Sequence, residues 1–265
     1  MSGYLYVLFF AASFFSTVAG TVCGIGGGVI IKPVLDSFGL MSASSVSFIS
    51  GCTVLGMSCC SFVKSKISGD SPVSGKIGLP LAVGAALGGV FGKMMFQSMS
   101  DVFTDKNMIG AVQAVCLLVF TVGTLIYTLI KERISTHQIE NGVSCLMVGL
   151  ILGVVSSFLG IGGGPINLVV LFYFFSMETK AAAHNSLYII MFSQFAGLIS
   201  TLVTGSVPEF PFLLMVLMVT GGVLGGVGGR SINNKMSADD VDKIFIALMI
   251  VIIGINVYNI VKFLK

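Results

Sequence analysis

A five-residue glycine motif that could bind an anion occurs twice in this chain. The sequence Gly-Ile-Gly-Gly-Gly fills positions 24–28 and again positions 160–164, an offset of 136. Glycine permits positive φ angles, and a helix that starts after such a stretch leaves its first N–H groups unpaired at the positive end of its dipole. Such N–H groups bind small oxyanions, so the two copies could hold one oxyanion between them. The candidate binding residues are Gly24, Gly26, Gly27, Gly28, Gly160, Gly162, Gly163 and Gly164.

Polar side chains near the glycine motifs are further candidates. Lys32 lies about one turn into the helix expected after the first motif, where its ammonium could bind the anion or reach out to the membrane interface. Asn167 holds nearly the same place after the second motif and is a neutral donor. Other polar candidates in apolar runs are His184, Asn185, Ser186 and Ser50, the last lying 136 positions before Ser186. The imidazole of His184 could bind the anion, pass a proton or only hydrogen-bond near the interface.

The elements that carry these residues must lie in lipid. The 265 residues are 55% hydrophobic and 9% charged, with a mean hydropathy of +1.03, whereas a soluble domain carries about 25% charged residues. Stretches without Asp, Glu, Lys or Arg cover residues 1–31, 37–63, 77–92, 107–130, 141–177, 181–208, 210–229 and 244–261. Each is near or above the roughly 20 residues that span a bilayer as a helix. The sequence therefore predicts an all-α polytopic membrane protein with about eight hydrophobic segments.

A second repeated motif indicates an internal duplication. Residues 84–93 (GAALGGVFGK) resemble residues 221–230 (GGVLGGVGGR) at an offset of 137. We therefore expect two membrane repeats, residues 1–135 and 136–265, that form one transmembrane domain. The glycines recur every four residues, which favours a face for close helix packing. Lys93 and Arg230 end these motifs, and we expect them at the membrane interface in preference to the binding site.

The distribution of basic residues favours a re-entrant path for the two glycine-broken segments. If all eight segments cross the membrane, seven basic residues fall on each side, which gives no bias. If the broken segments return to the side they entered, nine basic residues fall on one side: Lys64, Lys66, Lys76, Lys131, Arg133, Lys180, Arg230, Lys235 and Lys243. The other side then has Lys93, Lys106, Lys262 and Lys265. Each repeat would cross three times, so the second repeat would be inverted, as is common in secondary transporters.

At this point the chain resembles the sulfite exporter TauE/SafE family, also called the toluene-sulfonate uptake permease grouping. The resemblance rests on GIGGGVIIKP at residues 24–33 and GIGGGP at residues 160–165, with a glycine-rich helix after each. A proline follows the first glycine cluster at Pro33, whereas the second half has Val169 at that place and its proline at Pro165. The resemblance implies transport of small sulfur-containing anions such as sulfite, thiosulfate or organosulfonates, and the composition itself does not specify sulfur.

The leading hypothesis is a secondary transporter that binds a small anion at the paired glycine breaks and works by alternating access. The alternatives are a channel or a transporter for a different small anion, or glycines that only bend and pack helices. An intramembrane enzyme is disfavoured, because no GxSG, HExxH or intramembrane aspartate pair is present. We expect no cofactor, no metal and no nucleic-acid partner. A coupling proton or sodium ion, a homo-oligomer and the direction of transport stay open, and a bacterial cell membrane is the expected location.

Overall fold

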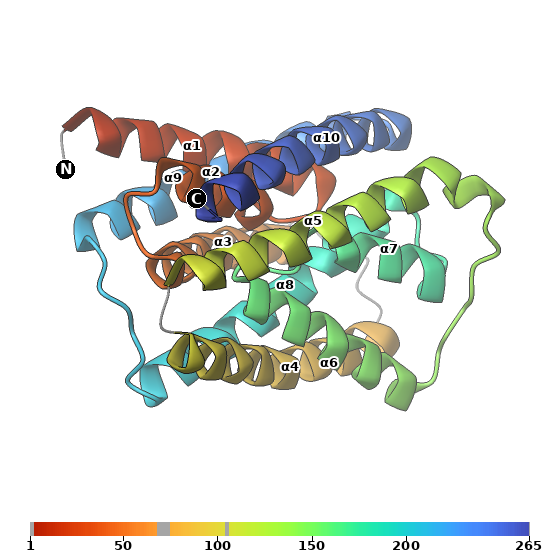
Figure 1. Ribbon diagram of the computed structural model, residues 1–265. Coiled ribbons are helices and arrows are strands. Elements are labelled where there is room, and N and C mark those ends of the chain that lie inside the picture. The colour runs from red at the N-terminus through yellow and green to blue at the C-terminus, as the bar shows by residue number, and fades with distance from the viewer. Residues whose placement is uncertain (1–2, 68–74, 104–105, 265) are drawn as a thin grey trace.

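The chain folds as a bundle of helices (Figure 1). The computed structural model describes residues 3–67, 75–103 and 106–264, with the backbone alone at positions 75 and 106. The helices are α1 (Gly3–Cys23), α2 (Gly28–Phe38), α3 (Ala43–Ile67), α4 (Gly75–Val102), α5 (Lys106–Ile130), the 3₁₀ turn η1 (Lys131–Arg133), α6 (Gly142–Leu159), α7 (Gly164–Phe175), α8 (Thr179–Val203), α9 (Phe212–Lys235) and α10 (Ala238–Phe263). Among the described residues, eight helices are long and apolar enough to cross a membrane, and α2 and α7 are not among them. The predicted all-α, multi-pass membrane protein is confirmed.

Each glycine motif separates a long helix from a short one. Helix α1 ends at Cys23 and α2 begins at Gly28, while α6 ends at Leu159 and α7 begins at Gly164. The first motif has φ angles of 74° at Gly24 and 74° at Gly26, and the second has 66° at Gly160 and 82° at Gly162. These angles are in the left-handed region, where only glycine fits without strain. The chain therefore leaves the helical path at both motifs because of glycine.

Each short helix turns back toward the end of the bundle where its long helix began. The ring of Phe38, at the end of α2, packs edge-on against Phe9 of α1 with 5.5 Å between ring centroids. The backbone N–H of His137, just before α6, donates to the carbonyl oxygen of Tyr173 in α7 at 2.7 Å. We call the two ends of the bundle the Gly3 end, on the left of Figure 1, and the Gly142 end, on its right.

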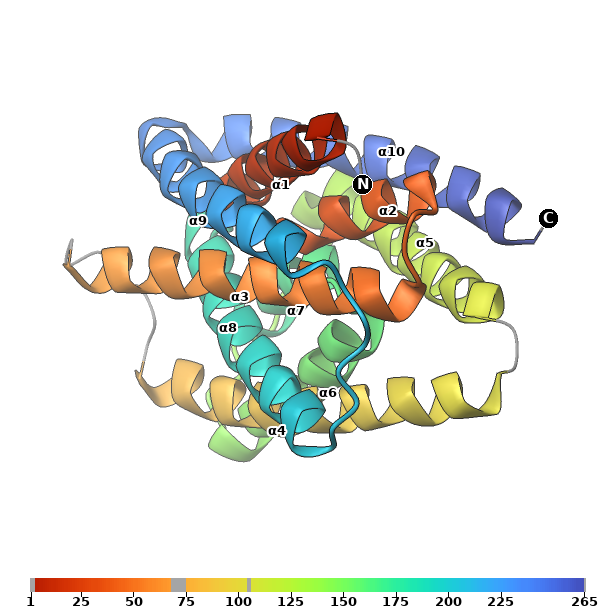
Figure 2. The same cartoon turned by 90° about the vertical axis from the view of Figure 1, so that its left-hand side faces the viewer.

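The long helices run between these two ends, as both ribbon views show (Figures 1 and 2). The Gly3 end holds the starts of α1, α3, α5 and α9 and the ends of α2, α4, α8 and α10. Contacts at this end include Ser45 Oγ donating to Glu209 O at 2.7 Å and Lys262 Nζ donating to Ser37 O at 2.8 Å. At the Gly142 end, Lys131 Nζ lies 2.5 Å from Asp242 Oδ2 and links η1 to the start of α10.

Rows of glycine bring two pairs of helices into backbone contact. A Cβ added at Gly84, Gly88 or Gly92 of α4 would lie 2.1, 2.1 or 2.4 Å from the carbonyl oxygens of Leu146, Leu150 and Val154 in α6. A Cβ added at Gly221, Gly225 or Gly229 of α9 would lie 3.0, 2.3 or 2.5 Å from the carbonyl oxygens of Phe10, Phe14 and Val18 in α1. In both helix pairs the residue numbers of the two contacting residues increase in the same direction. Helix α4 therefore runs parallel to α6, and α9 runs parallel to α1. The predicted packing role of these glycines is confirmed.

We expect Gly88→Ala to lower the midpoint of thermal unfolding in detergent, because its methyl group would press on the backbone of α6. Such overpacking costs about 1–3 kcal/mol. Gly123 of α5 is the matched control, since a Cβ there meets no atom within 4 Å. Gly123→Ala should leave the midpoint unchanged or raise it slightly, because alanine favours the helix by up to about 1 kcal/mol. Equal midpoints for the two variants would contradict the close packing of α4 on α6.

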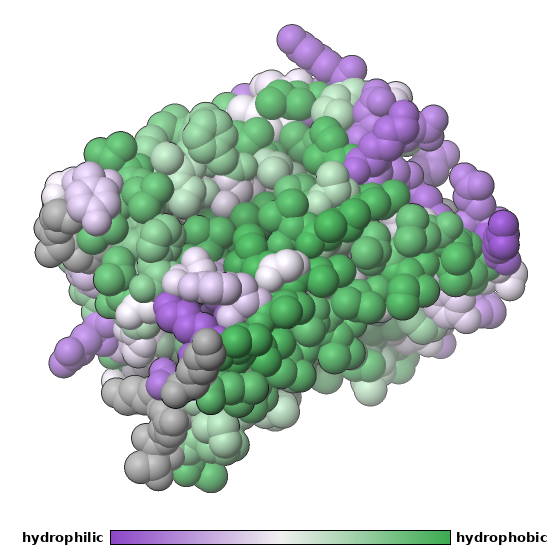
Figure 3. Space-filling model, turned by 45° about the horizontal axis from the view of Figure 1, so that its top comes forward, coloured by the Kyte–Doolittle hydropathy of each residue, from purple (hydrophilic) through white to green (hydrophobic). Residues whose placement is uncertain are grey.

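The surface has the distribution expected of a protein in a bilayer. Figure 3 shows a broad hydrophobic face between hydrophilic residues at its upper right and lower left. Exposed apolar side chains include Val119 of α5 at 62% and Ile250 of α10 at 58%. From the helix directions, the nine basic residues assigned to one side by sequence all fall toward the Gly142 end. Lys93 and Lys262 fall toward the Gly3 end, whereas Lys265 lies outside the described residues.

Candidate functional site

The two glycine breaks contact each other in the interior of the bundle. A Cβ added at Gly28 would lie 2.3 Å from the carbonyl oxygen of Ile161, and one added at Gly164 would lie 2.5 Å from Cγ2 of Val29. All residues at positions 20–29 and 159–165 are buried. The two glycine motifs, which are 136 positions apart in the sequence, therefore contact each other in the fold.

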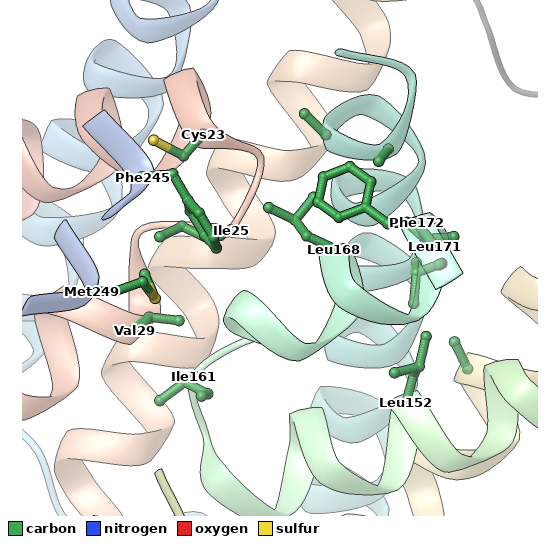
Figure 4. Close-up of a cluster of buried hydrophobic side chains, with 14 of the residues drawn as sticks. Cys23, Ile25, Val29, Leu152, Ile161, Leu168, Leu171, Phe172, Phe245 and Met249 are labelled. Carbon is green, nitrogen blue, oxygen red and sulfur yellow. The ribbon is translucent and has the colours of Figure 1, made fainter. Parts of the chain in front are cut away.

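An apolar cluster surrounds this contact. Ile25 from the first break, Val29 of α2 and Ile161 from the second break are 0% exposed. They belong to one cluster with Phe245 and Met249 of α10 (Figure 4). The breaks are thus kept from lipid, as irregular backbone within a membrane must be.

Helices α3 and α8 contact the same two breaks. A Cβ at Gly26 would lie 3.3 Å from Cδ1 of Ile190 and 3.6 Å from Cγ1 of Val54. A Cβ at Gly162 would meet the same two side chains, at 3.2 and 2.7 Å. Val54 belongs to α3 and Ile190 to α8, again 136 positions apart. The polar residues on these faces of α3 and α8 are therefore placed beside the breaks.

Serine side chains occupy those faces. Ser47 of α3 contacts the second break, since a Cβ at Gly160 would lie 2.8 Å from its Oγ. Ser47, Ser50 and Val54 follow helical spacing and share one face of α3, so Ser50 lies between two residues that touch the breaks. The corresponding face of α8 carries Ala183, Ser186 and Ile190. Of these, Ala183 contacts the first break, since a Cβ at Gly24 would lie 2.2 Å from its Cα.

Within the part of the chain that the structure describes, the polar side chains around the breaks are buried and lack hydrogen-bond partners. Ser50, Ser186 and Asn167 are 0% exposed. Within the described residues, no hydrogen-bond partner meets the Oγ atoms of Ser47, Ser50 and Ser186 or either polar side-chain atom of Asn167. Asn167 adjoins the second break, because a Cβ at Gly163 would lie 2.5 Å from its Nδ2. An unpaired buried polar group costs about 1–3 kcal/mol, so a group of them calls for an explanation, and a polar ligand supplies one.

The N-termini of α2 and α7, which are the positive ends of their helix dipoles, both lie at the contact between the two breaks. Gly27 is the N-cap of α2 and Gly163 the N-cap of α7, and neither has a side-chain cap. Pro165 lies in the first turn of α7, where a missing N–H costs nothing. The free N–H groups of the first turns and the two dipoles favour a negative charge between the helices. In this arrangement the two breaks are packed against each other, with Gly28 on the carbonyl of Ile161.

Lys32 forms a buried ion pair with Asp36 in α2. Its Nζ is 2.8 Å from Asp36 Oδ2, and the side chains are 3% and 6% exposed. The alternative in which Lys32 reaches out to the interface is wrong, because the residue is buried in the protein. The i, i+4 spacing of the two residues is the feature of the sequence that indicates this ion pair.

The three polar residues near the start of α8, His184, Asn185 and Ser186, have different surroundings. Ser186 faces the breaks, while Asn185 Nδ2 donates to Ala181 O in its own helix at 2.9 Å. His184 is half-buried and lines two small pockets, of about 20 and 10 Å³, toward the Gly142 end. Arg230 lines both pockets with it. The structure thus brings Ser186 to the glycine breaks and leaves Asn185 and His184 beside them.

The two cations of the repeated glycine rows are not at the interface, so that expectation is wrong. Lys93 lines a cavity of about 1040 Å³ at the Gly3 end, together with Phe48, Gln97 and Thr201. It precedes the end of α4 by nine residues, which places it roughly 13–14 Å along the helix from that end. Arg230 is 5% exposed, and its Nη1 donates to Ser61 O at 3.1 Å. Both cations are held inside the bundle.

Ser47 lies beside the second break and was not among the candidates predicted from the sequence. It lies one turn before Ser50 on the same helix face, which is the signal that could have found it. Position 183, its counterpart 136 residues later, is alanine, so a search for matched polar pairs passes over it. Within the described residues, no group of three His, Cys, Asp or Glu side chains is placed to hold a metal ion.

Comparison with known proteins agrees with the membrane fold. The family model described as "Sulfite exporter TauE/SafE" matches residues 9–257. The Bacillus subtilis (strain 168) protein described as "Probable membrane transporter protein YunE" is 27% identical over 117 residues, which cover 44% of this chain and 41% of that protein. No solved structure matches the chain. Because the family model covers nearly the whole sequence, this chain belongs to the TauE/SafE sulfite exporter family of membrane transporters.

Proposed function

We propose that this transporter moves small sulfur-containing anions, such as sulfite, thiosulfate or organosulfonates, and binds one anion between the N-termini of α2 and α7. The observation that carries the proposal is the set of buried, unpaired side chains of Ser50, Ser186 and Asn167 around the glycine breaks. Hydroxyl and amide groups donate to an oxyanion, and two helix dipoles add a positive field. The family description supplies the expectation of sulfur.

The proposed architecture is a pair of inverted repeats, residues 1–135 and 136–265. Matched contacts support it: Gly24 packs on Ala183, and Gly160 packs on Ser47, at a shared offset of 136. The order of long and short helices in the first half recurs in the second, from opposite ends of the bundle. Such repeats place a binding site near the bilayer midplane at the repeat interface.

We place the Gly142 end in the cytoplasm of a bacterial cell, with the Gly3 end outside. Among the described residues, nine basic residues toward the Gly142 end against Lys93, Lys106 and Lys262 toward the Gly3 end support this orientation. The cavity of about 1040 Å³ then opens to the outside, while the described pockets beside Arg230 hold about 20 and 10 Å³. The difference between the ends supports alternating access. Coupling through a proton on His184, a sodium ion or the membrane potential is compatible with this arrangement.

The test is Asn167→Leu, assayed by sulfite flux in proteoliposomes. Loss of one hydrogen bond to an anion costs about 1.5–3 kcal/mol, so we expect transport efficiency to fall roughly tenfold to hundredfold. Because Asn167 has no partner among the described residues, the variant should melt at the wild-type temperature or higher. Loss of transport without loss of stability is the result expected for a side chain that binds the ligand.

The matched control is Asn256→Leu in α10. Asn256 is equally buried, at 1% exposed, but its Nδ2 donates to Ile252 O in its own helix at 2.8 Å. We expect this variant to keep its sulfite flux. Wild-type flux in the Asn167→Leu protein would contradict anion binding at the glycine breaks. Saturable flux with exchange of internal for external sulfite separates a transporter from a channel.

A further inference from the structure

Lys93 is a cation inside the open cavity, and no carboxylate of the described residues neutralises it. Within the described part of the chain it forms no ion pair, and its Nζ lies 5.6 Å from the centre of the Phe96 ring. Its stem lies on α8, where a Cβ at Gly197 would be 3.3 Å from Lys93 Cγ. The acidic residues of the cavity, Asp101 and Glu209, are exposed. An anion that enters this cavity therefore meets a positive charge at depth.

Arg230 has the same place in the other half of the molecule. Lys93 follows Gly92 and Arg230 follows Gly229, each after the third glycine of its packing row. Arg230 Nη1 donates to Ser61 O of α3, and Ser61 lies 136 positions before Gly197, the residue that Lys93 contacts. The two cations thus rest on corresponding positions of corresponding helices.

The residues that line the spaces around the two cations correspond as well, although these spaces differ in volume. Phe48 lines the cavity at the Gly3 end, and His184, 136 positions later, lines both pockets at the Gly142 end. Thr201 lines the cavity, and Ser65, 136 positions earlier, lines a pocket with Arg230. The cavity holds about 1040 Å³ and the pockets about 20 and 10 Å³, space for about one water each. One end is open and its counterpart is closed.

We propose that Lys93 and Arg230 are paired anion-capture residues, one for each side of the membrane. Lys93 holds a small oxyanion that enters from the Gly3 end before it reaches the glycine breaks. Arg230 does the same at the Gly142 end once that end opens, and its planar guanidinium can pair with two oxygens of the anion. While that end is closed, Ser61 O accepts from Arg230 in the place of the ligand. This inference rests on the proposed anion transport.

The test is the Michaelis constant for sulfite, measured from each side in right-side-out and inside-out membrane vesicles. We expect Lys93→Gln to raise the KM about tenfold or more from the Gly3 side only, as loss of a charge-assisted hydrogen bond does. Arg230→Gln should raise it from the Gly142 side only. Lys93→Arg should keep the wild-type KM, because the charge remains. Lys243→Gln is the control, since its side chain is 78% exposed at the Gly142 end.

The outcomes separate this inference from the proposed function. Sulfite flux in the wild type with an unchanged KM in Lys93→Gln, or an equal change from both sides, overturns the capture sites alone. If Arg230→Gln does not fold, Arg230→Lys keeps the charge and should raise the KM from the Gly142 side by a smaller factor. Absence of wild-type flux refutes the proposed function. Stabilisation by sulfite in the wild type but not in Lys93→Gln would then still support binding at Lys93.

Discussion

Asp36→Asn is expected to leave this protein unable to fold stably. The Lys32–Asp36 pair is buried in α2, with Nζ and Oδ2 2.8 Å apart. Removal of the carboxylate leaves a buried ammonium without a counter-charge, which costs about 3–5 kcal/mol. Native proteins are stable by only about 5–15 kcal/mol. We expect little monodisperse protein on size-exclusion chromatography in detergent and a strongly lowered midpoint of thermal unfolding.

Two companion variants test the reason for this loss. The double variant Lys32→Met with Asp36→Leu removes both charges and keeps apolar volume, so its midpoint should lie close to that of the wild type. Lys243→Gln breaks an exposed pair, in which Lys243 Nζ lies 3.9 Å from Asp240 Oδ1, and should leave the midpoint unchanged. A wild-type midpoint for Asp36→Asn itself would show that water or another group neutralises Lys32.

The Lys32–Asp36 ion pair is one of several contacts that hold α2 in place. An isolated helix of 11 residues is marginal without tertiary contacts. Helix α10 supplies two of them, since Asn259 Nδ2 donates to Pro33 O at 2.8 Å and Lys262 Nζ to Ser37 O at 2.8 Å. These contacts fix the far end of α2, so the N-terminus of α2 stays at the glycine break. We therefore expect the pair to affect anion binding through the position of α2.

The features predicted correctly from sequence are those with local causes. A charge-free run of about 20 residues has one stable form in lipid, so the spanning helices could be assigned from length alone. The breaks at Gly24 and Gly160 could be predicted because the left-handed φ angles need glycine. The offset of 136 also predicts that Ser50 and Ser186 correspond, and this correspondence stays a prediction. Their role in binding stays a prediction.

The features that sequence could not supply depend on which helices pack side by side. Lys93 and Arg230 end apolar runs, and such cations usually reach the interface. Here α4 continues nine residues past Lys93, and α3 offers the carbonyl of Ser61 to Arg230. Asn167 is likewise buried and unpaired within the described residues, and its own helix does not predict either property. No spacing within one helix encodes these contacts.

The second large effect is expected for Gly24→Ala. A Cβ at Gly24 would lie 2.2 Å from the Cα of Ala183, a backbone atom of α8 that cannot turn aside. The residue also has a φ of 74°, which costs a non-glycine residue about 1–2 kcal/mol. Displacement of α8 adds about 1–3 kcal/mol, by analogy with overpacked cores. We expect a large fall in the midpoint of thermal unfolding and loss of sulfite flux, because α8 carries Ser186.

Gly26→Ala separates the two causes. Gly26 has the same φ of 74°, but its Cβ would meet the flexible end of Ile190 at 3.3 Å. The backbone strain is therefore shared by both variants, while the pressure on the backbone of α8 belongs to Gly24→Ala alone. We expect Gly26→Ala to fold with a smaller loss of stability and to keep part of its flux. If the two variants lose equal stability, backbone strain alone explains the glycine at position 24, and close approach of α8 to the first break has no energetic role.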